Sequence, residues 1–94
     1  MPLDIARQFG TNLVLARKRA DLSQEELGWL ASLHRTEVGL LERGARTPRI
    51  DTLVKLASAL DVPVACPLLD GITWNPGSTQ SGTFTLSRSP EETP

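Results

Sequence analysis

Three arginines follow one another at three-residue intervals in the middle of the chain: Arg43, Arg46 and Arg49. No acidic residue stands between Arg43 and Ile50, so their sequence neighbours do not neutralise them. Guanidinium groups bind phosphate through charge and paired hydrogen bonds. Such contacts give affinity and salt dependence without recognising bases. We therefore expect the three side chains to contact a nucleic-acid backbone; the alternative is a solvated loop with scattered arginines.

The overall composition limits this interpretation. The 94 residues suffice for one hydrophobic core and exclude a large enzyme with a separate cofactor domain. Hydrophobic residues make up 39% and charged residues 22%, which is ordinary for a globular protein. The formal net charge is −1, so nucleic acid cannot be held by bulk positive charge. Any such binding must depend on where the charges lie.

Other kinds of chemistry have little support. One cysteine, Cys66, cannot form an internal disulfide, and together with the one histidine, His34, it cannot supply a zinc site. We expect Cys66 to be a small buried residue and His34 to lie at a helix start or in a groove. No catalytic constellation is present, so we predict a protein that is not an enzyme and uses no cofactor or metal. No apolar run approaches the about 18 to 20 residues that cross a membrane.

Hydrophobic spacing predicts helices before and after a capping box. Apolar residues at helical spacing indicate a first helix over residues 3–19. Ser23 and Glu26 have the spacing of a capping box, in which each side chain accepts from the other's backbone N–H. A second helix is therefore expected over residues 24–31.

Two further helices and a weak fifth one follow. The third is expected over residues 34–43, and Asp51 is the expected N-cap of the fourth. The fourth helix carries an apolar stripe of Leu53, Leu56, Ala57 and Leu60. Residues 61–70 could hold a fifth helix of one or two turns, although Pro63 and Pro67 conflict with it.

The composition changes at Gly71, where 15 of the last 24 residues are Gly, Pro, Ser or Thr. We therefore divide the chain into a helical domain, residues 1–70, and a tail, residues 71–94, that frays from residue 87. Alternating residues predict a short β-hairpin, or an extended tail. Its apolar residues need cover from the helical core or from a second copy. They are Ile72, Trp74, Phe84 and Leu86, and we group Trp29 with them as a hairpin-packing or dimer contact.

The second and third helices together suit a helix-turn-helix. They are short, lie in tandem and are joined by a tight turn. Gly28 provides the small side chain that a close helix crossing requires. The residues expected to face inward are Leu27, Ala31, Leu33, Val38 and Leu41. The other face of the third helix is then free to enter a groove.

Several motifs in this order resemble the Cro/lambda-repressor-type helix-turn-helix family, also called the XRE family. They are Phe9-Gly10-Thr11-Asn12-Leu13, Leu22-Ser23-Gln24-Glu25-Glu26-Leu27, Leu41-Glu42-Arg43-Gly44, Pro48 and Asp51-Thr52-Leu53-Val54-Lys55-Leu56-Ala57. The resemblance covers residues 8–69. It implies an all-α, five-helix domain that binds double-stranded DNA, usually as a homodimer, through the start of the third helix.

The resemblance also assigns roles to single residues. Gln24 matches a glutamine that contacts phosphate, at a helix N-terminus where backbone amides also favour an anion. Base-facing positions are matched by Arg35, Thr36 and Leu40. Finally, Arg17 and Glu42 match a pair that joins the first helix to the end of the third; the alternative is an ordinary surface pair.

Some residues depart from the family pattern. Ser32 replaces the usual turn glycine and must adopt a left-handed conformation, and His34 is a weaker cap than Ser or Thr. Glu37 stands near the DNA, where its carboxylate can accept from cytosine N4 but repels phosphate. Gly39 and Leu40 replace polar side chains, although Leu40 can touch a thymine methyl group. These departures affect the operator sequence and the affinity.

Two functions remain. The first is a sequence-specific transcriptional regulator, a repressor, that acts as a homodimer in the bacterial cytoplasm and on the nucleoid. The second is an antitoxin-like or coactivator-like interaction module, whose tail binds a protein partner and whose DNA binding is secondary. Glu37, Leu40 and the apolar set of Trp29, Trp74 and Phe84 favour the second function, whereas the arginine cluster favours the first.

Overall fold

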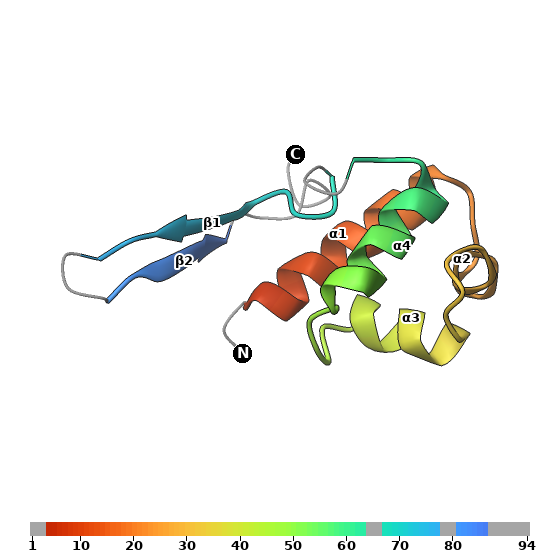
Figure 1. The fold of residues 1–94 in the computed structure, drawn as a ribbon, viewed down its shortest axis with the longest axis horizontal. Helices are drawn as coiled ribbons and strands as arrows, with labels where there is room; N and C mark the ends of the chain where they lie inside the picture. Colours follow the sequence, from red (N-terminus) through yellow and green to blue (C-terminus); the bar gives the residue numbers. More distant parts are fainter. Residues whose placement is uncertain (1–3, 64–66, 78–80, 87–94) are drawn as a thin grey trace.

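The computed structural model describes residues 4–63, 67–77 and 81–86. Four helices and a hairpin follow one another along the chain (Figure 1): α1 (Ile5–Arg19), α2 (Gln24–Leu30), α3 (Arg35–Glu42), α4 (Ile50–Leu60), β1 (Ile72–Asn75) and β2 (Thr83–Leu86). The helices pack together, and the hairpin projects from them. The predictions for Cys66 and for a frayed end from residue 87 lie outside the described residues.

The described part of the chain contains four helices, so the prediction of five is wrong. Residues 67–71 form turns. Proline removes a backbone donor and clashes with the preceding turn of a helix, and Pro63 and Pro67 both fall within residues 61–70, where the fifth helix was expected. The Asn12 side-chain amide donates to the carbonyls of Leu68 and Asp70 at 2.9 and 2.8 Å, while its oxygen accepts from Gln8. The turn is therefore held to α1 by a buried amide.

Local capping explains where three of the helices begin. Asp4 accepts from the Arg7 N–H, and Ser23 and Glu26 form the predicted capping box, with bonds of 3.0 and 2.8 Å. The His34 Nδ1 caps α3 by accepting from the Thr36 N–H at 3.0 Å.

The predicted N-cap of α4 is wrong. Asp51 lies within the first turn and accepts from the Thr52 N–H, and the N-cap is Arg49, which makes no side-chain cap. A carboxylate in the first turn still stabilises the helix through its dipole.

The core lies where α1, α2, α3 and α4 meet. Its buried apolar residues are Phe9, Leu13, Ala16, Leu27, Ala31, Val38, Leu41, Leu56, Ala57, Leu60 and Leu68. The inward-facing residues predicted for the helix-turn-helix are among them, apart from Leu33, which is partly buried against the same core. None of the helices in the described ranges is long and apolar enough to cross a membrane.

Two glycines lie where the backbone of a helix comes close to the backbone of a neighbouring segment. A Cβ at Gly28 would lie 2.6 Å from the Leu33 carbonyl oxygen, as the predicted close crossing requires. A Cβ at Gly10 would lie 2.6 Å from the carbonyl oxygens of Leu41 and Glu42, so α1 crosses the end of α3 at this residue. Ser32 has φ +56°, which confirms the left-handed turn predicted for it.

The hairpin is antiparallel, as predicted, and pairs Ile72 with Leu86 and Trp74 with Phe84. Directly opposed residues share a face, and the Trp74 and Phe84 rings meet edge to face with centroids 4.9 Å apart. Both rings remain about half exposed. Leu86 and Phe84 face the start of α1 across a hollow of about 480 Å³.

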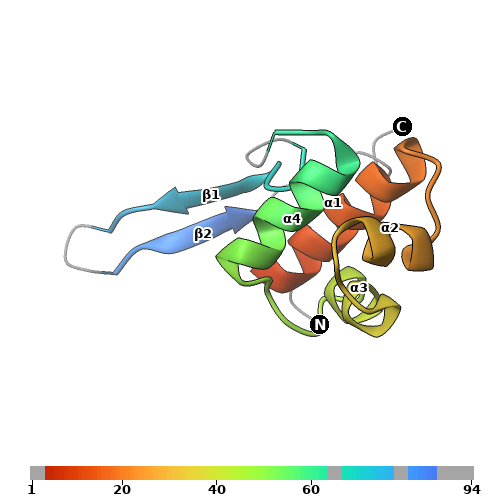
Figure 2. The ribbon, with the colours of Figure 1, turned by 45° about the vertical axis from the view of Figure 1, so that its right-hand side comes forward.

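Trp29 does not pack under this hairpin. Its side chain is 86% exposed, and α2 lies at the opposite end of the molecule from β1 and β2 (Figures 1 and 2). The expected contact of Trp29 with the hairpin of its own chain is therefore wrong, because the helical domain separates them.

We predict that Gly28→Ala lowers the free energy of unfolding by about 1–3 kcal/mol, because the new methyl group is forced against a carbonyl oxygen that cannot move freely. Gly39→Ala is the matched control. There the Cβ meets the ends of two flexible side chains, the Arg43 Nη1 at 3.2 Å and the Gln24 Oε1 at 3.8 Å. Because Ala is the better helix former, the control should be neutral or gain up to about 1 kcal/mol. Chemical denaturation measures both, and equal effects would contradict the prediction.

Candidate nucleic-acid interface

One side of α3 faces away from the core. Val38, Gly39 and Leu41 are buried, whereas Arg35 and Thr36 are exposed and Leu40 is half buried. Thr36 and Leu40 are four residues apart, so they share the face of the helix that leaves the core. This face carries the residues expected to contact bases.

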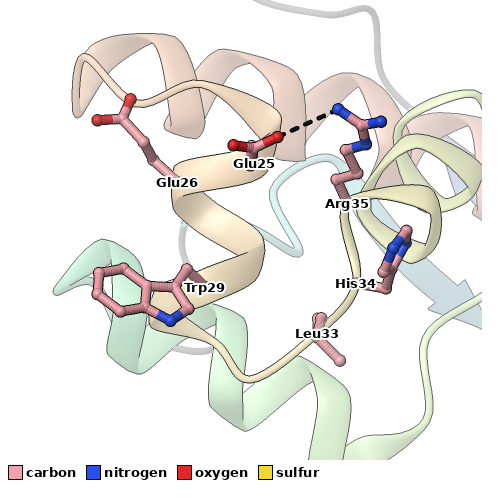
Figure 3. A pocket seen from close by; sticks show the side chains of 6 residues that line it. All are labelled: Glu25, Glu26, Trp29, Leu33, His34 and Arg35. Atoms are coloured by element: carbon pink, nitrogen blue, oxygen red, sulfur yellow. Dashed lines mark hydrogen bonds and ion pairs between the residues drawn. The ribbon is translucent and has the colours of Figure 1, made fainter.

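The arginines around this face have acidic partners. Arg35 Nη1 pairs with Glu25 Oε2 at 3.1 Å (Figure 3), and Arg49 Nε pairs with Asp51 Oδ1 at 3.4 Å. The third pair is made by Arg46 Nη2 and Glu37 Oε1. The arginine side chains are still at least half exposed and point to solvent.

The sequence did not predict these pairs, because no acidic residue lies within residues 43–49, which we call the arginine loop. The partners Glu37 and Asp51 come from α3 and α4 and are separated from their arginines by nine and two positions. The pair of Arg46 with Glu37 depends on the fold, because it joins the loop back to α3, whereas Asp51 lies just beyond the loop in the sequence.

The Arg43 side chain, at the end of α3, folds back along the helix toward Gly39. Its Nη1 is 3.2 Å from where a Cβ of Gly39 would be, and the Gln24 Oε1 is 3.8 Å from the same point. Gly39 therefore leaves room for a guanidinium beside the start of α2. Gly39 stands inside a short helix, where glycine lowers helix stability, and this is the feature of the sequence that could have indicated the arrangement.

Glu42 fixes the position of α3. Arg17 donates to it through Nε and Nη2, at 2.6 and 3.1 Å, and also donates to the Leu22 carbonyl at 2.8 Å. The Gln24 side-chain amide donates to the same carboxylate at 2.9 Å. The side chains of Arg17 and Glu42 are only 14% and 4% exposed, so this ion pair is not an ordinary surface pair. It ties α1 and the start of α2 to the end of α3.

Two hollows flank the start of α3. One, of about 530 Å³, lies between α2 and α3 and is lined by Glu25, Glu26, Trp29, Leu33, His34 and Arg35 (Figure 3). The other, of about 480 Å³, lies between α3 and the arginine loop and includes Glu37, Arg46 and Arg49. Within the described residues, no group of three His, Cys, Asp or Glu side chains could hold a metal ion.

Residues 13–65 match a family model described as helix-turn-helix. The chain belongs to the helix-turn-helix family. The match contains α2, α3 and α4 and the C-terminal part of α1 from Leu13, and it leaves the hairpin outside.

Among its relatives are proteins named as control or controller proteins. It is 39% identical over 62 residues to control protein C.SmaI of Serratia marcescens, which covers 66% of this chain and 74% of the relative. It is 39% identical over 63 residues to control protein C.BamHI of Bacillus amyloliquefaciens, covering 66% and 78%. The crystal structure of the restriction-modification controller protein C.AhdI from Aeromonas hydrophila has a TM-score of 0.62 and 41% identity, covering 63% of this chain and 89% of that one.

The predicted resemblance to the XRE family is thereby confirmed, and this helix-turn-helix protein is a DNA-binding transcriptional regulator. The hairpin has no counterpart in the matched range.

We predict that Glu42→Ala lowers the free energy of unfolding by about 3 kcal/mol, because it leaves the nearly buried Arg17 without its charge partner. The control is Glu25→Ala, which removes an exposed pair and should cost less than about 1 kcal/mol. Thermal or chemical unfolding of both variants distinguishes the two cases. A loss at Glu42 no larger than that at Glu25 would show that the ion pair does not support the fold.

Proposed function

We propose that this protein is a sequence-specific repressor that binds a two-fold symmetric operator as a homodimer. The observation that supports this best is the outward face of α3, an eight-residue helix flanked by arginines. One helix of this length contacts few base pairs, so a second copy supplies the remaining affinity and fixes the register. A dimer bound over a promoter excludes the polymerase from it.

In this proposal the side chains divide into two groups. Arg35, Thr36, Glu37 and Leu40 face the bases in the major groove. Gln24 contacts a phosphate at the start of α2, and the arginine loop contacts the backbone through Arg43, Arg46 and Arg49. Arg35, Arg46 and Arg49 are paired with carboxylates in the free protein, so a DNA phosphate or guanine must compete with those carboxylates for each arginine.

The names of the relatives suggest the genes that are regulated. Two are control proteins and a third is a restriction-modification controller protein. We propose that this protein regulates the genes of a restriction-modification system, in the bacterial cytoplasm and on the nucleoid.

Selection of bound sequences from random DNA gives the operator, on which the arginines can be tested. Arg35→Ala should weaken operator binding by about 1–3 kcal/mol and relax the preference at one base pair. Arg46→Ala should reduce the salt slope of log K by about 0.9. Lys55→Ala, an exposed cation in the middle of α4, is the control that should change neither. Fluorescence anisotropy across salt measures all three.

Two results would reject the proposal. Wild-type protein that shows no salt-dependent binding to any duplex is not a DNA regulator of this kind. If the Arg35 and Arg46 variants bind like the Lys55 control, α3 and the arginine loop are not the DNA-binding surface.

For the homodimer, we propose that residues 71–94 form the dimerisation segment and that the hairpin supplies the contact. The shared face of Ile72, Trp74, Phe84 and Leu86 is apolar, and residues 71–87 carry no charge, so like charges do not oppose pairing of two copies. The hairpin lies away from α3 (Figures 1 and 2), so this contact leaves the DNA-binding face free.

The double substitution Trp74→Thr and Phe84→Thr should lower the dimer fraction, since it removes two half-exposed rings and keeps residues that favour strands. Lys55→Ala on α4 is the control and should leave the dimer fraction unchanged. Sedimentation velocity over a concentration series measures the dimer fraction. A double variant that dimerises like the wild type would place the interface elsewhere.

A second candidate function has its own support. Trp29 and Leu30 are 86% and 56% exposed, and Trp29 borders the hollow between α2 and α3. Exposed apolar groups of this kind favour contact with another protein, as an antitoxin-like or coactivator-like module requires. The Arg35→Ala and Arg46→Ala variants separate the two functions, because both should weaken operator binding if the regulator proposal is right.

A further inference from the structure

Three acidic residues hold arginines that surround the face of α3, and they differ in burial. The side chains of Glu25 and Asp51 are 75% and 57% exposed, whereas that of Glu37 is 26% exposed. Water screens exposed pairs and leaves them weak, but a partly buried pair is screened less. Glu37 is therefore the carboxylate with the strongest hold on its arginine in this set.

The position of Glu37 also matters for its behaviour on DNA. It lies in the first turn of α3, where the helix dipole favours its negative charge. Arg46 comes from the loop that would face the phosphates. If Arg46 moves to a phosphate, Glu37 loses its partner and its negative charge faces the DNA. On a duplex without a matching base, Arg46 can therefore bind a phosphate only if Glu37 is left without a partner for its charge.

A matched duplex differs because a base can replace Arg46 as the partner. The N4 amino group of cytosine donates in the major groove, and a glutamate can accept from it. With this donor opposite Glu37, the arginine is free to bind a phosphate or a neighbouring guanine. The ion pair then opens only on DNA that places a donor at the right position.

We propose that Glu37 is a specificity-determining residue, which holds Arg46 and thereby suppresses binding to the phosphate backbone of unmatched DNA. This inference rests on the proposed function, because it requires α3 to enter the major groove. It adds that an acid on the DNA-binding face lowers non-specific affinity more than operator affinity.

The test uses the isosteric, uncharged variant Glu37→Gln on the operator selected by the wild type and on a scrambled duplex of the same length. One additional phosphate contact should make the salt slope on the scrambled duplex steeper by about 0.9, which raises affinity about eightfold at 0.1 M salt. Operator affinity should rise less, so the specificity ratio falls. Repeated selection should also replace cytosine by adenine at one position, because glutamine pairs with adenine.

Two controls isolate the ion pair. Asp61→Asn changes the net charge equally at the far end of α4, at a left-handed residue that Asn tolerates, and it should leave the ratio unchanged. In the background of Arg46→Gln, Glu37→Gln should no longer steepen the slope. Circular dichroism of each variant verifies that it folds.

The outcomes separate this inference from the proposed function. If the wild type prefers no sequence, the proposed function fails and the inference fails with it. If the wild type prefers its operator and Glu37→Gln leaves the scrambled-duplex affinity and slope unchanged, only the inference is overturned. A rise in scrambled-duplex affinity equal to that of the Asp61 control, or one that persists without Arg46, overturns it as well.

Discussion

Glu42 carries its charge in a nearly buried place, and its partners come from separate parts of the chain. Arg17 on α1 and Gln24 on α2 both donate to this carboxylate at the end of α3, and Arg17 also holds the loop before α2. A charge removed from water needs several donors to be stable. The position of α3 relative to the rest of the fold therefore depends on this one carboxylate and its donors.

Close backbone contacts allow this arrangement. Gly10 brings α1 against the end of α3, and Gly28 brings α2 against the turn before α3. A Cβ at either residue would lie 2.6 Å from a carbonyl oxygen, so the neighbouring backbone would have to move away. The polar contacts and the glycine crossings thus specify the same geometry, and together they turn one face of α3 outward.

Local patterns in the sequence predicted much of the fold. The capping box at Ser23 and the hairpin strands depend on residues close together in the chain, so their spacing was informative, whereas the left-handed Ser32 was implied by the family resemblance. The fifth helix was wrong because Asn12 of α1 holds residues 67–71 as turns, and the Asp51 cap was wrong because α4 already begins at Ile50. The pair of Arg46 with Glu37 was missed because the fold brings together residues nine positions apart, whereas Asp51 follows Arg49 by two positions and lay just past the interval considered.

The buried amide of Asn12 has a consequence for how this chain can be recombined with others. Its side chain closes the turn of residues 67–71, which joins the helical domain to the hairpin, and Gln8 orients that amide. Aspartate has the same shape but offers no donor to two carbonyl oxygens. A chimeric protein that receives this hairpin must therefore receive residues 8 and 12 of α1 with it, and the unit of exchange is larger than the tail.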